Sequence, residues 1–523
     1  MELNTSASAP QEQEHQNHLA TLPTEIIEKI AENLDLPDLS NLRLTCRDMS
    51  RRATGPHMKS HFHAQTTDLS SSSLARLVAI TSNPTFGPAV KRLTVLATVY
   101  FADWLDKMAG PALNMTRIAG SYSENQIEEF PQDLEFISDR RAEQSLAELE
   151  AHVSVIEQLT VIMKNLGHLD SVNLVGVVVT SRDQMCSPAR AAPKLWHNVA
   201  RRAAQAFYVT MEAMVRSGLQ TPVFQVFPTT RRCSIPAGCV SWLLSVMDIE
   251  PLGTALSPLK NFSLSFAPIS GTRNEIGLGP GRAGGQGGGH EGEDGPEAAA
   301  LEEETFQALP ALLGLMPQLE ILDLHMYNPF RRRSVGYSNI FVNMARDVQF
   351  PKLQKCILRG IWGTEESLLQ FLEKHASQIE HLELRDFWLT EGTWAPVFRQ
   401  LNTKQMPNLG FLRLENLFYG ENKLVNLAPR NPEPIDDRQT AEVSSIISFP
   451  CTGGHCVFLR EFGPVVLNRG LEFSTEDRGR LLPSPEFKRW KMNRGDEFGP
   501  PPEAREYEEV VNILAHVASI NGG

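Results

Sequence analysis

The residues with the clearest chemical potential are two cysteines and a histidine late in the sequence. Cys451, His455 and Cys456 carry thiol and imidazole groups, which are common zinc ligands. A structural zinc site needs four such ligands, and no second pair stands at a suitable spacing. Cys233 and Cys239 are too widely spaced to complete a finger-like set. We interpret the segment as a glycine-flanked turn with incidental thiols and expect no metal site.

A glycine-rich stretch contains the spacing used by dinucleotide-binding loops. Gly279, Gly281 and Gly284 form a G-x-G-x-x-G pattern, in which backbone amides can approach a pyrophosphate. That function also needs a strand before the pattern and a helix after it. Here Pro280 lies inside the pattern, no β-branched strand precedes it, and more glycine follows. We expect no bound dinucleotide and no other cofactor.

Sequence motifs of common enzymes are missing. No G-x-S-x-G, P-loop or HExxH motif occurs, and no cysteine stands beside a credible base and an orienting residue. We therefore predict no catalytic residues and a protein that is not an enzyme. A hydrolase or oxidoreductase would need a metal or cofactor found in the purified protein.

A basic cluster raises the question of nucleic-acid binding. Arg331, Arg332 and Arg333 follow Tyr327 and Phe330, a combination that suggests phosphate or nucleic acid as a ligand. The whole chain opposes this, because 49 Lys and Arg against 62 Asp and Glu give a formal charge of -13. Three arginines on a loop are more typical of a solvated tip or of a contact for an acidic partner. We expect neither nucleic acid nor a membrane as a partner.

Composition indicates a large folded protein from a reducing compartment. Of 523 residues, 41% are apolar and 21% charged, which supplies a core and too little charge for wholesale disorder. The 7 cysteines are unclustered and odd in number, so they do not form a disulfide framework. The start of the chain is polar. The sequence contains no run of eighteen apolar residues, so it predicts no membrane-spanning helix. These features predict the cytoplasm, the nucleus or both.

Changes in composition divide the sequence into six segments. The glycine-dominated stretch cannot build a core and is predicted to be a flexible insertion. The predicted segments are a disordered lead-in at 1–18, a helical module at 19–56, a degenerate first part of a repeat region at 74–270, the insertion at 271–300, a second repeat part at 301–425, and a C-terminal extension or cap at 426–523.

An apolar triplet with the spacing L-x-x-L-x-L recurs along the chain. Its last two side chains fall on one face of a short strand, and its first anchors the turn that enters the strand. The triplets are Val90, Leu93 and Val95; Leu169, Val172 and Leu174; Leu259, Phe262 and Leu264; Leu319, Leu322 and Leu324; Leu353, Cys356 and Leu358; Ile379, Leu382 and Leu384; and Leu409, Leu412 and Leu414. Four of them follow a proline that fixes the turn into the strand, namely Pro88, Pro317, Pro351 and Pro407.

The spacing of the triplets predicts the fold. The last four begin 34, 26 and 30 residues apart, close to the period of leucine-rich repeats. Between them, residues 364–372 predict a capped amphipathic helix, and longer helices are predicted within 139–166 and 194–215. We predict an α/β fold, in which a small three-helix module precedes an irregular leucine-rich-repeat-like solenoid. An ordinary α/β domain with several leucine-rich strands is the alternative.

The N-terminal module has strong helix signals. Residues 22–34 combine a proline near the helix start, acids in the first turn and an apolar stripe at Ile26, Ile27, Ile30 and Leu34. A second stripe follows at Leu39, Leu42 and Cys46. About thirty-five residues bury too little surface to be very stable alone. We therefore expect this module to bind a partner.

The segment from Leu22 to Ala53 resembles the F-box, whose pattern begins Leu-Pro-x-Glu and ends near Cys-Arg. The matching residues are Leu22, Pro23, Glu25, Ile26, Ile27, Ile30, Leu34, Asp38, Leu39, Leu42, Arg43, Cys46 and Arg47. An F-box followed by leucine-rich repeats is similar to fungal substrate-receptor proteins. The resemblance implies that the module binds a Skp-family adaptor, and through it a cullin ubiquitin ligase, while the repeats select a protein substrate of unknown identity.

Seven apolar residues are the candidate adaptor-binding site: Leu22, Pro23, Ile26, Ile27, Ile30, Leu39 and Leu42. Ile27, Ile30 and Leu34 could equally form the core of the module, and both interpretations stay open for each single residue. The alternative function is a leucine-rich-repeat scaffold that binds proteins without ubiquitin transfer.

Overall fold

The computed structural model describes most of the chain between residues 21 and 463. The described residues are 21–101, 124–149, 152–182, 185–186, 196–230, 233–267, 303–327, 336–401, 404–420, 423–425, 427, 446–451 and 454–463. The predicted lead-in at 1–18, the glycine-rich stretch at 271–300 and the cluster at 331–333 lie outside them.

Four short helices form the N-terminal module, one more than predicted within the described residues. They are α2 (Thr24–Ala31), α3 (Leu36–Thr45), α4 (Arg47–Arg52) and α5 (Pro56–Ser60). Asp35 caps α3, because its Oδ1 accepts a hydrogen bond from the backbone N–H of Asp38 at 2.9 Å. The Cys46 thiol caps α4 by accepting from the N–H of Met49 at 3.4 Å. Buried Ala31, Leu39 and Met58 form a small core between the helices.

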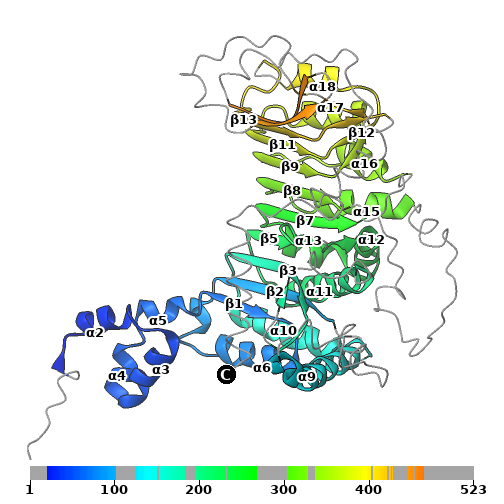
Figure 1. The fold of residues 1–523 in the computed structure, drawn as a ribbon. Coiled ribbons are helices and arrows are strands. Elements are labelled where there is room, and N and C mark those ends of the chain that lie inside the picture. The colour runs from blue at the N-terminus through cyan, green and yellow to red at the C-terminus, as the bar shows by residue number, and fades with distance from the viewer. Residues whose placement is uncertain are drawn as a thin grey trace, which may run out of the picture.

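A 13-stranded sheet forms the centre of the described structure (Figure 1). Its parallel strands follow one another in chain order: β1 (Ala64–Thr67), β2 (Arg92–Tyr100), β3 (Ser171–Val179), β5 (Val223–Val226), β7 (Asn261–Ala267), β8 (Ile321–Met326), β9 (Lys355–Arg359), β11 (His381–Arg385) and β13 (Phe411–Glu415). Antiparallel β17 (Gly454–Phe462) and β16 (Ile446–Cys451) extend it beyond β13. Short β4 (Met185–Cys186) pairs with β3, and β6 (Ile235–Pro236) pairs with β7.

The register of the sheet aligns the predicted triplets. One buried row crosses the strands through Leu93, Val172, Phe224, Phe262, Leu322, Cys356, Leu382 and Leu412. A second buried row lies two residues further along each strand. Each of the predicted triplets ends in a strand, so those strands are confirmed. The sequence missed β5, because two extra residues separate Leu219 from Phe224, and β1, because Gln65 and Thr67 occupy its buried positions.

Helices line one side of the row of strands (Figure 1). They are α6 (Ser71–Thr81), α10 (Val153–Leu166), α11 (Trp196–Ser217), α12 (Ala237–Val246), α13 (Ile249–Leu256), α15 (Glu303–Gly314), α16 (Ser338–Asp347), α17 (Glu365–Lys374) and α18 (Trp394–Gln400). Parallel strands need such crossover connections, and the apolar faces of the helices close one continuous core against the sheet. The helices predicted within 194–215 and 364–372 are confirmed as α11 and α17.

The long helix predicted within 139–166 is two helices that pack on opposite faces of the sheet. They are α9 (Glu124–Leu149) and α10, and His152 between them has a left-handed φ of 58°. Ile137 of α9 packs with Leu96 and Tyr100, which alternate along β2 with the residues that face α10. The apolar spacing therefore did not reveal two helices on different faces, because periodicity does not record which face of a sheet a helix covers.

A second, smaller sheet forms where the chain leaves the main one. Its strands are β10 (Trp362–Thr364), β12 (Trp388–Glu391), β14 (Phe418–Tyr419) and β15 (Lys423–Leu424). The corners between the sheets lie at Gly360, Asp386 and Asn416, with left-handed φ values of 66°, 52° and 52°. The Asn416 amide donates to Asp386 Oδ1 at 2.9 Å, which links two successive corners. The same turn thus recurs after β9, β11 and β13.

The predicted mixed α/β class with an N-terminal helical module is confirmed. The irregular leucine-rich-repeat solenoid stays a prediction. The sheet begins at Ala64, ten residues before the predicted start of the repeat region at 74. Among the described residues, no single helix is long and apolar enough to cross a membrane; only α12 and α13 taken together meet that test by length and composition, and they are bent by 119°.

Candidate functional site

The N-terminal module holds the seven predicted adaptor-binding residues, which differ in exposure. Ile27 and Leu39 are buried, with 1% and 0% of their surface exposed. Half-buried are Leu22, Ile30 and Leu42. Pro23 and Ile26 are exposed, and 42% of the Ile26 surface is accessible. Ile27 and Leu39 therefore stabilise the module from inside, whereas Pro23 and Ile26 offer apolar surface to a partner. Adaptor contact by any of the seven stays a prediction.

Leu44 is an apolar surface residue that sequence reasoning missed. It lies on α3, and 83% of its surface is exposed. Leu39 and Leu42 account for the apolar stripe by which this helix packs, and Leu44 lies outside that stripe. A large apolar side chain outside the packing stripe of a small helix is the signal that could have indicated Leu44, because exposure of such a side chain to water does not stabilise the fold.

A polar cluster lies on α4. Asp48 accepts hydrogen bonds from Arg51 at 2.9 Å and from Arg52 at 3.2 Å. The hydrogen bond from Arg52, followed by that from Arg51, lowers the pKa of the Asp48 carboxyl. The Arg51 pair is exposed and contributes little stability, whereas the Arg52 side chain is only 11% exposed.

The same segment was compared with models of known protein families. Residues 19–61 match the F-box domain. The match includes all of α2 to α5, so the F-box extends through α5 beyond the predicted end at residue 56. F-box domains bind Skp-family adaptors within cullin complexes, which suggests an adaptor role in a ubiquitin ligase for this chain. F-box proteins are generally substrate adaptors rather than enzymes. A search of curated proteins finds no match for the chain.

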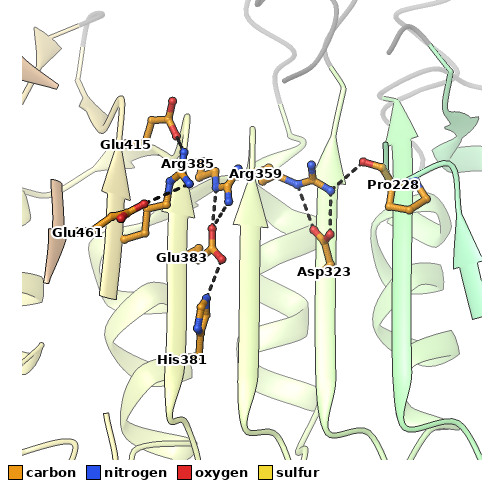
Figure 2. A network of polar contacts seen from close by, with 9 residues as sticks. Pro228, Asp323, Arg359, His381, Glu383, Arg385, Glu415 and Glu461 are labelled. Carbon is orange, nitrogen blue, oxygen red and sulfur yellow. Dashed lines mark hydrogen bonds and ion pairs between the residues drawn. The ribbon is translucent and has the colours of Figure 1, made fainter. Parts of the chain in front are cut away.

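A second candidate surface is the face of the sheet opposite the helices, between β8 and β17. Figure 2 shows a row of ion pairs across these strands. Arg359 donates to both oxygens of Asp323, at 3.1 and 2.8 Å, and to the carbonyl of Pro228 at 3.0 Å. These hydrogen bonds connect β9 to β8 and to Pro228, which lies two residues after the end of β5.

The row continues on β11 and β13 with the same alternation of charge. Glu383 accepts hydrogen bonds from Arg385 and His381, the latter at 2.7 Å (Figure 2). Arg413 contacts Glu415 at 2.8 Å and Glu461 of β17 at 3.3 Å. Each acid therefore has a basic neighbour, and this part of the face has little net charge to attract a strongly charged partner.

Burial and pairing move the pKa values of this row in opposite directions. Burial raises the pKa of Asp323, although the charge and hydrogen bonds of Arg359 partly counteract it. Burial also disfavours ionised Glu383, but the hydrogen bond from His381 and the charge of Arg385 outweigh it and lower the pKa of Glu383 to about 2. Glu383 is therefore ionised at neutral pH although only 5% of its surface is exposed.

The cysteines considered as metal ligands lie in two separate parts of the described chain. Cys233 and Cys239 are buried, and burial raises the pKa of both thiols, that of Cys239 to about 12. Cys451 ends β16 and Cys456 lies in β17. Within the described part of the chain, no group of three or more His, Cys, Asp or Glu side chains could hold a metal ion. The glycine pattern at 279–284 lies outside the described residues.

A small cavity of about 30 Å³, lined by both polar and apolar residues, lies near the start of α6. Asp68, Tyr100, Arg140, Glu143 and Arg202 contribute to its wall. Their polar groups are engaged with one another or with the backbone: Tyr100 donates to Asp68, Arg140 to Glu143, and Glu143 accepts from the N–H of Ser71. The cavity has room for a water molecule or two and not for an organic substrate.

Proposed function

We propose that this protein is the substrate-recognition subunit of a Skp–cullin–F-box ubiquitin ligase. The F-box binds the Skp-family adaptor, and the strand–helix units that follow bind a protein substrate. The observation that carries this proposal is the F-box match at residues 19–61, on a separate helical module with exposed apolar residues. The protein acts by bringing substrate and ligase together and performs no chemistry of its own.

The large sheet supports the second half of the proposal. Its parallel strands bear aligned leucine-type triplets, and α15, α16 and α17 alternate with β8, β9 and β11, an arrangement typical of leucine-rich repeats. Stacked units of this kind offer an extended surface on which many residues can each contribute a weak contact. Its described ion pairs are mutually neutralised, which favours a protein over a polyanion as the ligand.

Binding to a purified Skp-family adaptor tests the first half. The intact chain should bind, while Ile26→Asp combined with Leu44→Asp should weaken binding by about tenfold or more, because each change places a charge in a desolvated apolar contact. The Leu22→Ala and Pro23→Ala pair tests the predicted residues in the same assay. Val161→Asp is the matched control, since Val161 of α10 is exposed to a similar degree, 46%, and lies far along the chain.

Two outcomes separate the alternatives. Absence of adaptor binding by the intact chain would contradict the ligase function and leave the protein as a repeat scaffold. Loss of binding in the Val161→Asp control as well would show that the charge acts through general instability and not through an interface.

A further inference from the structure

The F-box and the sheet are joined by a very short connection. Only residues 61–63 separate α5 from β1. The carbonyl of His63 accepts hydrogen bonds from the N–H groups of Lys91 and Arg92, both at 2.8 Å, so the chain enters the sheet at a fixed point. Attachment at this single point would still allow the F-box to rotate relative to the sheet. The orientation of the F-box therefore depends on further contacts beside residues 61–63.

Phe86 makes those contacts from the sheet side. Its ring stacks on Phe62, with ring centroids 4.3 Å apart and an interplanar angle of 19°. The guanidinium carbon of Arg43 on α3 lies over the same ring, 5.4 Å from its centroid. Phe62 and Phe86 both pack against the F-box core of Ala31, Leu39 and Met58. One side chain of the sheet region thus contacts the connection through a ring stack, and the F-box through a cation–π pair and apolar packing.

The turn that carries Phe86 is itself held firmly. Asn83 Oδ1 accepts from the N–H groups of Thr85 at 2.8 Å and Phe86 at 3.2 Å. The next residue, Gly87, begins the 3-10 helix η1 (Gly87–Ala89), and a Cβ there would lie 2.4 Å from the carbonyl oxygen of Thr81. This close approach requires glycine and fixes the path of the turn against the end of α6. Phe86 is therefore presented by a preorganised turn.

Arg43 connects this contact to the partner-facing side of the F-box. It precedes Leu44, and successive residues on a helix point about 100° apart. Arg43 faces Phe86, whereas Leu44 is exposed. A partner bound at Leu44 and the Phe86 ring beside Arg43 would therefore contact α3 on two different sides.

We propose that Phe86 is a positioning residue that locks the F-box in one orientation relative to the sheet. This inference rests on the proposed function, because a fixed orientation sets where a substrate on the sheet lies relative to the ligase. Positioning raises the effective concentration of the reacting groups, and rotational freedom lowers it. Without the Phe86 ring, residues 61–63 become a hinge while the F-box surface that contacts the adaptor stays intact.

The test measures distances between two labels in the full chain, introduced through unnatural amino acids at Asn41 of α3 and Ala79 of α6, both exposed. The unchanged chain should give one narrow distance distribution. Phe86→Ala should broaden it about twofold or more, while adaptor affinity changes by less than about twofold. Phe86→Tyr should restore the narrow distribution, because it keeps the ring. Phe411→Ala is the matched control, since it removes another half-buried stacked ring far from the junction.

A second variant tests the contact in case Phe86→Ala unfolds the junction locally. Arg43→Gln removes the cation without opening a cavity, and it should broaden the distribution of label distances to a smaller degree than Phe86→Ala does. In a reconstituted ligase, Phe86→Ala should also spread self-ubiquitination over more lysines than in the unchanged chain. The proposal is overturned if both variants keep the original width, or if the unchanged chain is already broad. Failure of the unchanged chain to bind the adaptor would instead contradict the proposed function, whatever the distance distributions show.

Discussion

Leu39 and Leu44 show how two leucines on one helix can have opposite roles. Leu39 is fully buried in the core of the F-box with Ala31 and Met58, whereas Leu44 is 83% exposed on the same helix. Burial of a leucine side chain stabilises a fold by roughly 2 kcal/mol, and exposure of one contributes nothing to it. Folding therefore explains the first residue, whereas a contact with a partner is our proposal for the second.

This contrast predicts different effects of the same truncation. Leu39→Ala should destabilise the F-box by about 2–5 kcal/mol, while Leu44→Ala should change its stability by less than about 0.5 kcal/mol. Hydrogen exchange of the α2 and α3 amides measures the local opening free energy of each variant. A comparable loss of protection in both would contradict the division into core and surface.

Glu383 supplies a pH-dependent contribution at the same scale. Its pKa of about 2 in the folded chain lies below the ordinary value of 4.5, mainly because His381 and Arg385 overcome the effect of burial. A carboxyl with a lowered folded-state pKa contributes its full stability above pH 4.5 and loses it as the pH falls toward 2. The contribution is about 3 kcal/mol.

We therefore expect the unfolding free energy of the unchanged chain to fall between pH 4.5 and pH 2 more steeply than that of Glu383→Gln. Urea titrations at several pH values measure both curves. Parallel curves for the unchanged chain and Glu383→Gln would contradict the assigned pairing.

At the scale of elements, the corner that recurs after β9, β11 and β13 decides how the second sheet forms. Gly360, Asp386 and Asn416 all have positive φ, so each turns the chain out of the main sheet in the same direction. Asp and Asn tolerate this region better than most residues, and glycine adopts it without a steric penalty. At Gly360 there is an additional reason, because a Cβ would lie 2.3 Å from the carbonyl oxygen of Met326.

Gly360→Ala should therefore destabilise the sheet by about 1–3 kcal/mol or more, since it combines a left-handed φ with a clash against backbone. Gly314→Ala at the end of α15 is the matched control, because its Cβ would meet nothing within 4 Å. Thermal unfolding of the two variants gives the comparison. Equal melting temperatures would show that the corner relaxes without cost.

At the scale of the whole molecule, the short junction separates the F-box from a sheet with its own core. The main core runs through the sheet and its helices, whereas the F-box core is a separate small cluster. A deletion of residues 1–60 should leave the sheet folded by circular dichroism and abolish adaptor binding. In cells, proteins captured by the sheet should then accumulate if the chain is a ligase receptor, and keep their abundance if it is a scaffold.

Most of the described parallel strands could be predicted from the sequence, while some elements could not. The triplets located β2, β3, β7, β8, β9, β11 and β13, because buried apolar spacing is a local property. β1 was missed since Gln65 and Thr67 are buried by pairing with β2, which is a nonlocal effect. The helix break at His152 was missed because both helices carry apolar stripes with similar spacing.

The sequence alone determined the F-box and the strand-forming triplets, since both depend on residues close together in the chain. Tertiary structure decided which F-box leucines are exposed to solvent, because exposure depends on which residues pack around them. It also decided that Asp323, Glu383 and Arg413 lie on one face with their partners, because that requires strands 26 to 34 residues apart in the chain to pair in one register. The contact of Phe86 with Arg43 and Phe62 is of the same kind: the aromatic residue stands 43 and 24 positions away from them and meets them only after the chain has folded.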